Sequence, residues 1–155
     1  MLIGLIADTH DAIGPWSGVL PKVAETFAGV GLILHCGDLT TSRVLDDLAT
    51  IADVVAVRSD NDPAADPPRL LEGPQVVEIG GVVIGLVNWL GESEPADVFG
   101  RRVDVVVHGG SHRAEITHAG GTVLVNPGSP TLADEVTVAL LDTAWRPPKV
   151  EIVTL

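Results

Sequence analysis

The 155-residue sequence predicts an α/β fold that begins with parallel strands and ends with antiparallel hairpins. Two observations support this prediction. The first third alternates short apolar runs with helical segments, in the order strand, helix, strand, helix, strand, which is typical of parallel sheets. The second half contains apolar runs joined by double glycines, and glycine readily adopts the positive φ angles that a tight hairpin requires.

The elements expected in the first third are strands at 2–7, 31–36 and 53–58 and helices at about 19–28 and 42–51. The stretch that follows, 58–74, carries four prolines and three aspartates and is expected to be a loop. Because this loop starts directly from a strand end, we expect it to help form a functional site rather than to link two domains.

In the second half, strands are expected at 76–79 and 82–87 on either side of a tight turn at Gly80-Gly81, and a second double-glycine turn is expected at Gly120-Gly121. A short helix is expected to begin near Pro95, and a strand to run over 103–107. A final strand pair is expected at 137–141 and 150–153, across a turn that contains proline.

Length and composition favour one soluble domain. Hydrophobic residues make up 46% of the chain but aromatic residues only 3%, so the core must consist mainly of Val, Leu, Ile and Ala. The single cysteine, Cys36, excludes an intrachain disulfide and is expected to be an inert buried residue. Without an apolar run of about 18 residues or a recognisable signal peptide, we expect a cytoplasmic protein that does not enter a membrane. The net charge of −12 argues against duplex nucleic acid as a partner.

Polar residues follow the first two predicted strands directly. Asp8 and His10 come after the first strand, and Gly37-Asp38 comes after the second. Since the carboxyl ends of parallel strands meet at one edge of a sheet, these side chains are expected to lie close together. Carboxylates and imidazoles are common ligands of divalent metals, so the sequence predicts a metal-dependent active site at this edge.

Five short motifs occur in the order and spacing of the calcineurin-like metallophosphoesterases, and the resemblance runs nearly from end to end. They are Asp8-x-His10, Gly37-Asp38, Ser59-Asp60-Asn61-Asp62, Gly109-Gly110-Ser111-His112 and Asn126-Pro127-Gly128-Ser129. The chain is most similar to the small phosphodiesterases without an added domain, a branch that also contains the scaffold subunit of the retromer coat. The resemblance implies two mixed β-sheets packed as a sandwich and flanked by helices, with metals at the carboxyl edges of the strands.

The same resemblance implies a first metal held by Asp8, His10 and His112, and Asp38 as the bridge to a second metal. Two cations side by side generate hydroxide from water and offset charge on the phosphate. Manganese is the metal we expect first, with iron, zinc or nickel as alternatives.

The second metal site departs from the family pattern. Its expected ligands are Asp38, Asp60 and Asn88, where Asp60 replaces an asparagine and Asn88 replaces a histidine. Gly110 stands where the family has another histidine, so this site lacks two imidazoles. We therefore expect one tight and one weak metal site.

We place Asp38, Asn61 and Asp62 in the catalytic group. Asn61 occupies the position where other members of the family carry a histidine that acts as general acid. Without that acid, small phosphodiesters with acidic leaving groups are the expected substrates, with phosphomonoesters as a further possibility. Arg58 and Arg113 lie next to motif residues and are expected to bind phosphate, or alternatively to pair with the many local aspartates.

Two other functions were weighed against a phosphodiesterase. A catalytically weak or silent protein that uses this fold as a binding scaffold fits the two missing histidines, and it leaves a protein partner or a homo-oligomer open. A Rossmann-like nucleotide-binding module fits the βαβαβ start, but Asp8-Thr9-His10 stands where that fold needs a glycine-rich turn. We set this third hypothesis aside.

Overall fold

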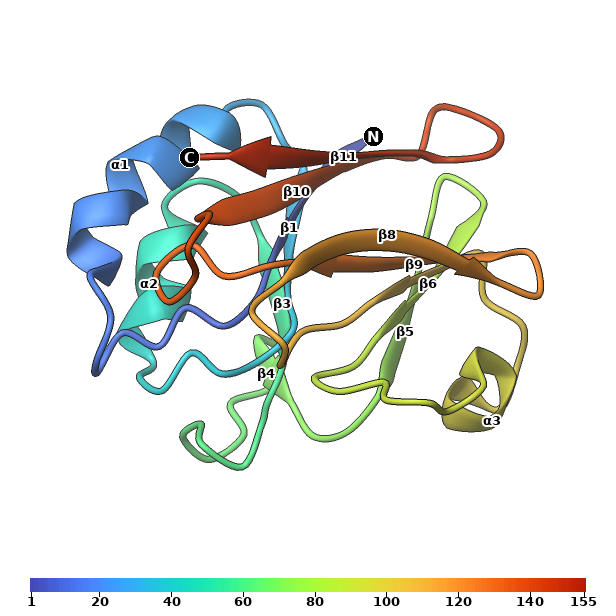
Figure 1. Ribbon diagram of the computed structural model, residues 1–155, viewed down its shortest axis with the longest axis horizontal. Coiled ribbons are helices and arrows are strands. Elements are labelled where there is room, and N and C mark those ends of the chain that lie inside the picture. Colours follow the sequence, from blue (N-terminus) through green and yellow to red (C-terminus); the bar gives the residue numbers. More distant parts are fainter.

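The computed structural model describes residues 1–155 and contains two mixed β-sheets packed face to face (Figure 1). The first sheet has the strand order β11-β10-β1-β2-β3-β4. Its strands are β1 (Leu2–Ile6), β2 (Leu32–His35), β3 (Val54–Val57), β4 (Leu70–Leu71), β10 (Thr137–Asp142) and β11 (Lys149–Thr154). The second sheet has the order β5-β6-β7-β9-β8. Its strands are β5 (Gln75–Ile79), β6 (Val82–Leu86), β7 (Val105–Val107), β8 (Ala114–Ala119) and β9 (Thr122–Pro127).

Helices cover the outer faces of the sandwich. Helices α1 (Trp16–Thr26) and α2 (Arg43–Ala49) pack on the first sheet, where Phe27 and Leu45 join Ile33 in one buried cluster. The short helix α3 (Pro95–Phe99) packs on the second sheet through Phe99. None of the helices combines the length and hydropathy needed to cross a bilayer.

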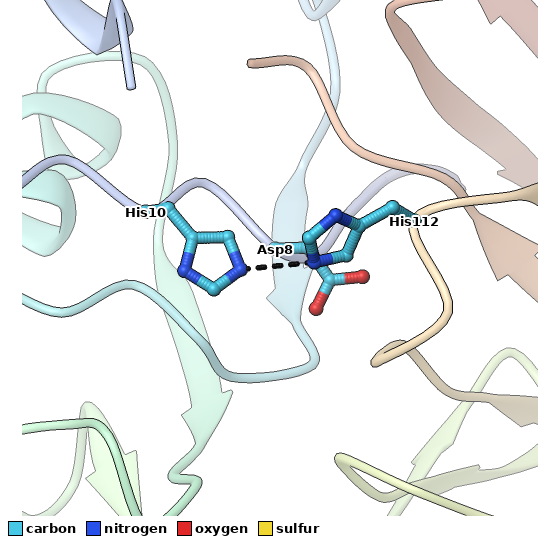
Figure 2. A group of neighbouring side chains, drawn as sticks. All are labelled: Asp8, His10 and His112. Carbon is cyan, nitrogen blue, oxygen red and sulfur yellow. Dashed lines mark hydrogen bonds between the residues drawn. The ribbon is translucent and has the colours of Figure 1, made fainter. Parts of the chain in front are cut away.

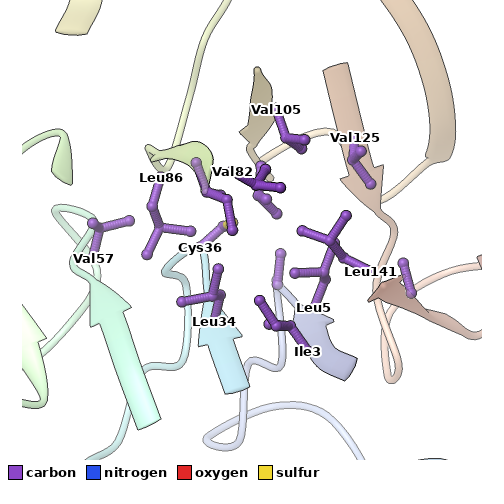
Figure 3. Packing of buried hydrophobic residues seen from close by; sticks show 14 residues of the cluster. Ile3, Leu5, Leu34, Cys36, Val57, Val82, Leu86, Val105, Val125 and Leu141 are labelled. Atoms are coloured by element: carbon purple, nitrogen blue, oxygen red, sulfur yellow. The ribbon is translucent and has the colours of Figure 1, made fainter. Parts of the chain in front are cut away.

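The main core lies between the two sheets and is built from aliphatic side chains, as the composition predicts (Figure 3). Leu5 and Leu34 of the first sheet and Leu86 and Val105 of the second belong to this cluster and are fully buried. Cys36 is buried in the same cluster, and burial raises the pKa of its thiol, so it stays in the unreactive thiol form.

The strand directions bring the loops of the site together. Strands β1, β2 and β3 are mutually parallel, and so are β6, β7 and β9. The loops that follow β1, β2, β3, β6 and β7 contain Asp8, Asp38, Asp62, Asn88 and His112 respectively. The predicted fold class, an α/β sandwich of two mixed sheets with flanking helices, is therefore confirmed.

Most element boundaries differ from the sequence prediction by only one or two residues, and three differences are informative. Helix α1 begins at Trp16, directly after Pro15, and ends at Thr26 rather than at 28. The loop expected over 58–74 contains strand β4, whose two residues pair in parallel with β3. Strand β7 covers only Val105–Val107. Both expected double-glycine hairpins are present, between β5 and β6 and between β8 and β9.

Candidate metal centre

The loops after β1 and β2 hold each other through backbone hydrogen bonds. The N–H of Asp8 donates to the carbonyl of Gly37 at 3.0 Å, and the N–H of His10 donates to the carbonyl of Asp38 at 2.9 Å. These bonds continue the parallel pairing of the two strands beyond their ends. They fix Asp8 and His10 beside Asp38.

Asp8, His10 and His112 form one group whose ligand atoms all lie within 4.8 Å of one another. Figure 2 shows the two imidazole rings facing each other with the Asp8 carboxylate beside them; their Nε2 atoms are 3.1 Å apart. The Nδ1 atom of His112 is 3.1 Å from the carbonyl oxygen of Leu132, which can only accept, so Nδ1 carries the proton. The Nε2 atom of His112 is left with a lone pair directed at the group, as a metal ligand requires.

The electrostatics of this group suit a cation. Burial raises the pKa of Asp8 to about 7, although the Gly110 N–H donates to both of its carboxylate oxygens at 3.0 and 2.9 Å. Burial also lowers the pKa of His10 and favours its neutral ring. The neutral ring of His10, the Nε2 atom of His112 and a buried carboxylate are a donor set that divalent transition metals bind readily. The residues present therefore fit the metal that the motifs imply.

Asp38 is held as a carboxylate next to this group. Its Oδ1 accepts hydrogen bonds from the Ser59 hydroxyl at 2.6 Å and from Asn61 Nδ2 at 2.9 Å, and its Oδ2 lies 3.4 Å from Asn88 Nδ2. Burial alone would raise the pKa of Asp38, but these hydrogen bonds from Ser59, Asn61 and Asn88 lower it. Asp38 is thus preorganised in its charged form.

Asp62 is buried and supports the backbone around Asp38. Its Oδ2 accepts from the N–H of Asp38 at 2.9 Å and from the N–H of Ser59 at 2.8 Å, and its Oδ1 accepts from the N–H of Thr40 at 2.8 Å. These contacts position the loop backbone, and the catalytic roles expected for Asp62 and Asn61 stay predictions. The neighbouring Asp60 is exposed and lies outside the group of Asp8, His10 and His112, so its metal-binding role stays a prediction.

Asn88 and Gly110 stand at the two positions where the second metal site lacks a histidine. Asn88 turns its Nδ2 toward the Cys36 carbonyl at 2.8 Å and toward Asp38, so it presents a donor to Asp38. At Gly110, φ is +86° and an added Cβ would lie 2.6 Å from the Trp89 ring. The indole of Trp89 thus occupies the space into which a side chain at position 110 would extend. Binding of a second metal by Asn88 stays a prediction.

The two candidate phosphate-binding arginines lie in different surroundings. Arg58 donates from Nε to the Pro63 carbonyl at 3.0 Å and pairs with Glu72 at 3.2 Å, so it stabilises the loop after β3. Arg113 is exposed and lines a cavity of about 810 Å³ beside His112. Arg58 is thus paired locally, but with a glutamate and loop carbonyls rather than with the expected aspartate side chains, and phosphate binding by either arginine stays a prediction.

His35, which belongs to none of the five motifs, lies at the junction of the two ligand loops. His35 is fully buried; its Nδ1 accepts from the Gly37 N–H at 3.0 Å, which leaves Nε2–H to donate to the Thr9 hydroxyl at 3.1 Å. Burial lowers the pKa of His35 to about 4. Its neutral ring links the loop of Asp8 to the loop of Asp38.

A second support comes from the loop after β9. The Ser129 hydroxyl donates to the Asp8 carbonyl at 2.7 Å, and the Thr131 hydroxyl donates to the Thr9 carbonyl at 2.8 Å. Through Ser129, the Asn126-Pro127-Gly128-Ser129 motif therefore supports the backbone of the Asp8 loop. Thr131 lies outside the five motifs, and the motif that contains Ser59 does not indicate which group its hydroxyl contacts.

Backbone strain is concentrated in the site. Five residues other than glycine have positive φ, and four of them are candidate ligands: Asp8 (+54°), His10 (+42°), Asp38 (+58°) and His112 (+58°). Residues held in the left-handed region cluster at functional sites, where the surrounding structure enforces them. This pattern singles out the same four residues as the sequence motifs.

Comparison with known proteins agrees with this geometry. The family model for the calcineurin-like phosphoesterase superfamily domain matches residues 1–145. The chain belongs to this superfamily. A probable metallophosphoesterase of Methanocaldococcus jannaschii is 36% identical over 140 residues, which cover 85% of this chain and 69% of that protein.

Two solved structures extend the comparison. One, described as a novel archaeal phosphodiesterase, superposes with a TM-score of 0.79 at 22% identity, and the match covers 100% of both chains. The other is wild-type Vps29 from Entamoeba histolytica in complex with zinc, with a TM-score of 0.72 at 25% identity over 99% of both chains. This calcineurin-like phosphoesterase thus shares its fold with a phosphodiesterase and with a zinc-binding Vps29.

Proposed function

We propose that this protein is a metal-dependent phosphodiesterase that hydrolyses small phosphodiesters. The observation that carries the proposal is the group of Asp8, His10 and His112, whose ligand atoms lie within 4.8 Å of one another beside the charged Asp38. Membership of a phosphoesterase superfamily supports hydrolysis of a phosphoester bond. The lack of a histidine at Asn61 favours diesters with acidic leaving groups over substrates that need a strong general acid.

In this proposal Asp8, His10 and His112 would hold the first metal, and Asp38 would offer its carboxylate as a ligand beside them. A divalent cation bound there supplies a polarised water as nucleophile and offsets the charge of the phosphate. Ser59 and Asn61 keep Asp38 ionised through the hydrogen bonds described above, and Asp62 fixes the backbone on which Asp38 stands.

We propose manganese as the working metal and a weak second site. Asn88 directs an N–H at Asp38, and Gly110 has no side chain, so this site relies on Asp38 and Asp60 alone among charged ligands. Zinc is the alternative metal, since the structurally similar Vps29 from Entamoeba histolytica was solved with zinc.

The test is hydrolysis of bis-p-nitrophenyl phosphate by purified protein at saturating Mn²⁺. We expect turnover that falls at least about 100-fold in Asp38→Ala and in His112→Ala. The exposed His118 on strand β8 provides the matched control, because His118→Ala removes an imidazole that lies outside the metal group. Turnover that persists in Asp38→Ala would contradict the proposal.

A binding scaffold remains the second candidate function. The observation that favours it is the replacement of both second-site imidazoles, together with the indole of Trp89 in the space beside Gly110. If the wild-type protein binds Mn²⁺ in calorimetry, with binding lost in His10→Ala, yet hydrolyses no phosphodiester, the scaffold is the correct reading. A soluble protein partner is then expected.

A further inference from the structure

The side chain of Trp89 lies beside the metal group and is 60% exposed, although tryptophan is highly buried on average. Trp89 directly follows Asn88, which donates to the Cys36 carbonyl at the edge of the site. The indole contacts Gly110, and the N–H of Gly110 donates to both oxygens of Asp8. One residue of backbone therefore separates the indole from a candidate metal ligand.

Two glycines make room for this ring. An added Cβ would lie 2.6 Å from Trp89 Cε3 at Gly110 and 3.0 Å from Trp89 Nε1 at Gly91. Both glycines have positive φ, +86° and +60°, so neither position readily accepts another residue. The next residue, Leu90, is buried and anchors the loop. The six-membered ring of the indole thus lies beside Gly110 and its five-membered ring beside Gly91, while much of its surface stays open to solvent.

The charge of the protein makes a contact of this kind useful. A phosphodiester is an anion, and the net charge of −12 opposes its approach. The guanidinium of Arg58 is already engaged by carbonyls of its loop and by Glu72. Stacking on an aromatic face does not depend on the sign of the charge, and it can supply the affinity that the overall field does not.

We propose that Trp89 is the platform on which a planar aromatic group of the substrate, a nucleobase or an aryl ring, stacks while the phosphate lies at the metal group. The inference rests on the proposed function for the placement of the phosphate. It adds a substrate class, phosphoesters whose phosphate carries a planar aromatic group, and a residue that selects it.

The experiment measures binding rather than turnover. Dissociation constants of the Mn²⁺-loaded protein are determined by calorimetry for adenosine 5′-monophosphate and for ribose 5-phosphate, which lacks only the base. A second pair, phenyl phosphate and ethyl phosphate, separates an aryl ring from a nucleobase as the preferred group. Removing an aromatic platform typically weakens binding of a stacked base by about 5- to 150-fold.

We expect the wild-type protein to bind the aromatic member of at least one pair at least about fivefold more tightly. Trp89→Ala should remove this preference without changing the affinity for the non-aromatic member by more than about twofold, and Trp89→Phe should retain part of it. The matched control is Trp145→Ala, because Trp145 is equally exposed, at 61%, but lies in the turn between β10 and β11.

Equal affinity within both pairs, no binding of any of the four compounds, or a preference that survives Trp89→Ala would each overturn the inference. The outcome is separable from the proposed function. Asp38-dependent hydrolysis without an aromatic preference rejects the role of Trp89 alone. An aromatic preference that depends on Trp89, in a protein without hydrolysis, supports the platform and rejects the phosphodiesterase.

Discussion

The neutral state of His35 makes a quantitative prediction for His35→Gln. The unfolded chain protonates this histidine near pH 6.5, whereas burial lowers its pKa in the folded protein to about 4. Between these values the unfolded state binds a proton that the folded state does not, so the free energy of unfolding falls as the pH falls. The fall in pKa from 6.5 to about 4, at about 1.36 kcal/mol per pKa unit, corresponds to roughly 3 kcal/mol lost by pH 4.

The assay is urea unfolding of wild-type and His35→Gln protein between pH 8 and pH 4 in the presence of EDTA. Asp8 acts in the opposite direction, because its raised pKa of about 7 stabilises the fold on acidification, but it does so in both proteins. The wild-type free energy minus that of His35→Gln should therefore be constant above pH 7.5 and fall by about 3 kcal/mol at pH 4. A difference that does not change with pH would refute the reasoning that His35 is buried and neutral.

Three further substitutions test the supports of the site. In a urea titration, Asp62→Asn should lower the free energy of unfolding by about 2 kcal/mol, because an amide donor replaces one of the two oxygens that accept backbone N–H groups. The control is Asp60→Asn at an exposed position, which should change the free energy of unfolding by less than about 0.5 kcal/mol. Gly110→His should not increase Mn²⁺-dependent hydrolysis of bis-p-nitrophenyl phosphate and should lower the melting temperature, because the new side chain collides with Trp89 at a φ of +86°; a faster enzyme would contradict this. Gly128→Ala should lower the free energy of unfolding, measured by chemical denaturation, by about 2 kcal/mol or more. The φ of Gly128 is +78°, and an added Cβ would meet the Thr137 hydroxyl and lie 3.1 Å from the Ala114 nitrogen. An unchanged denaturation midpoint would show that the turn can relax.

Hydrophobic patterning was sufficient to predict the order of the main strands and helices. The apolar runs around 2–7, 31–36 and 53–58 all became buried strands, because burial against helices on one side and a second sheet on the other demands such runs. Strand β4 was missed because two residues are too short to show a period. It exists because Leu70 fills the core beside Ala56, a contact between residues far apart in sequence.

The site was predictable to the extent that its residues follow strand ends. Asp8, His10 and His112 were expected together, and the structure brings them together. The direction of the Asn88 amide and the engagement of Arg58 were not predictable, since both depend on carbonyl groups whose positions only the folded loops define. The contact of Trp89 with Gly110 likewise depends on the packing of two loops from different strands.

The left-handed backbone of Asp8, His10, Asp38 and His112 lowers the stability of the fold, because residues with a Cβ disfavour this conformation. Glycine would relieve the strain at each of these positions, at a gain of up to roughly 1 kcal/mol per residue. At Asp8 and Asp38 the replacement would also remove the carboxylates that accept hydrogen bonds from Gly110, Ser59 and Asn61, and these lost bonds oppose the gain. Gly110 also has positive φ, but it carries no side chain that could bind a metal. Asp8, His10, Asp38 and His112 therefore mark the positions where this protein keeps a candidate ligand side chain despite the strain in its backbone.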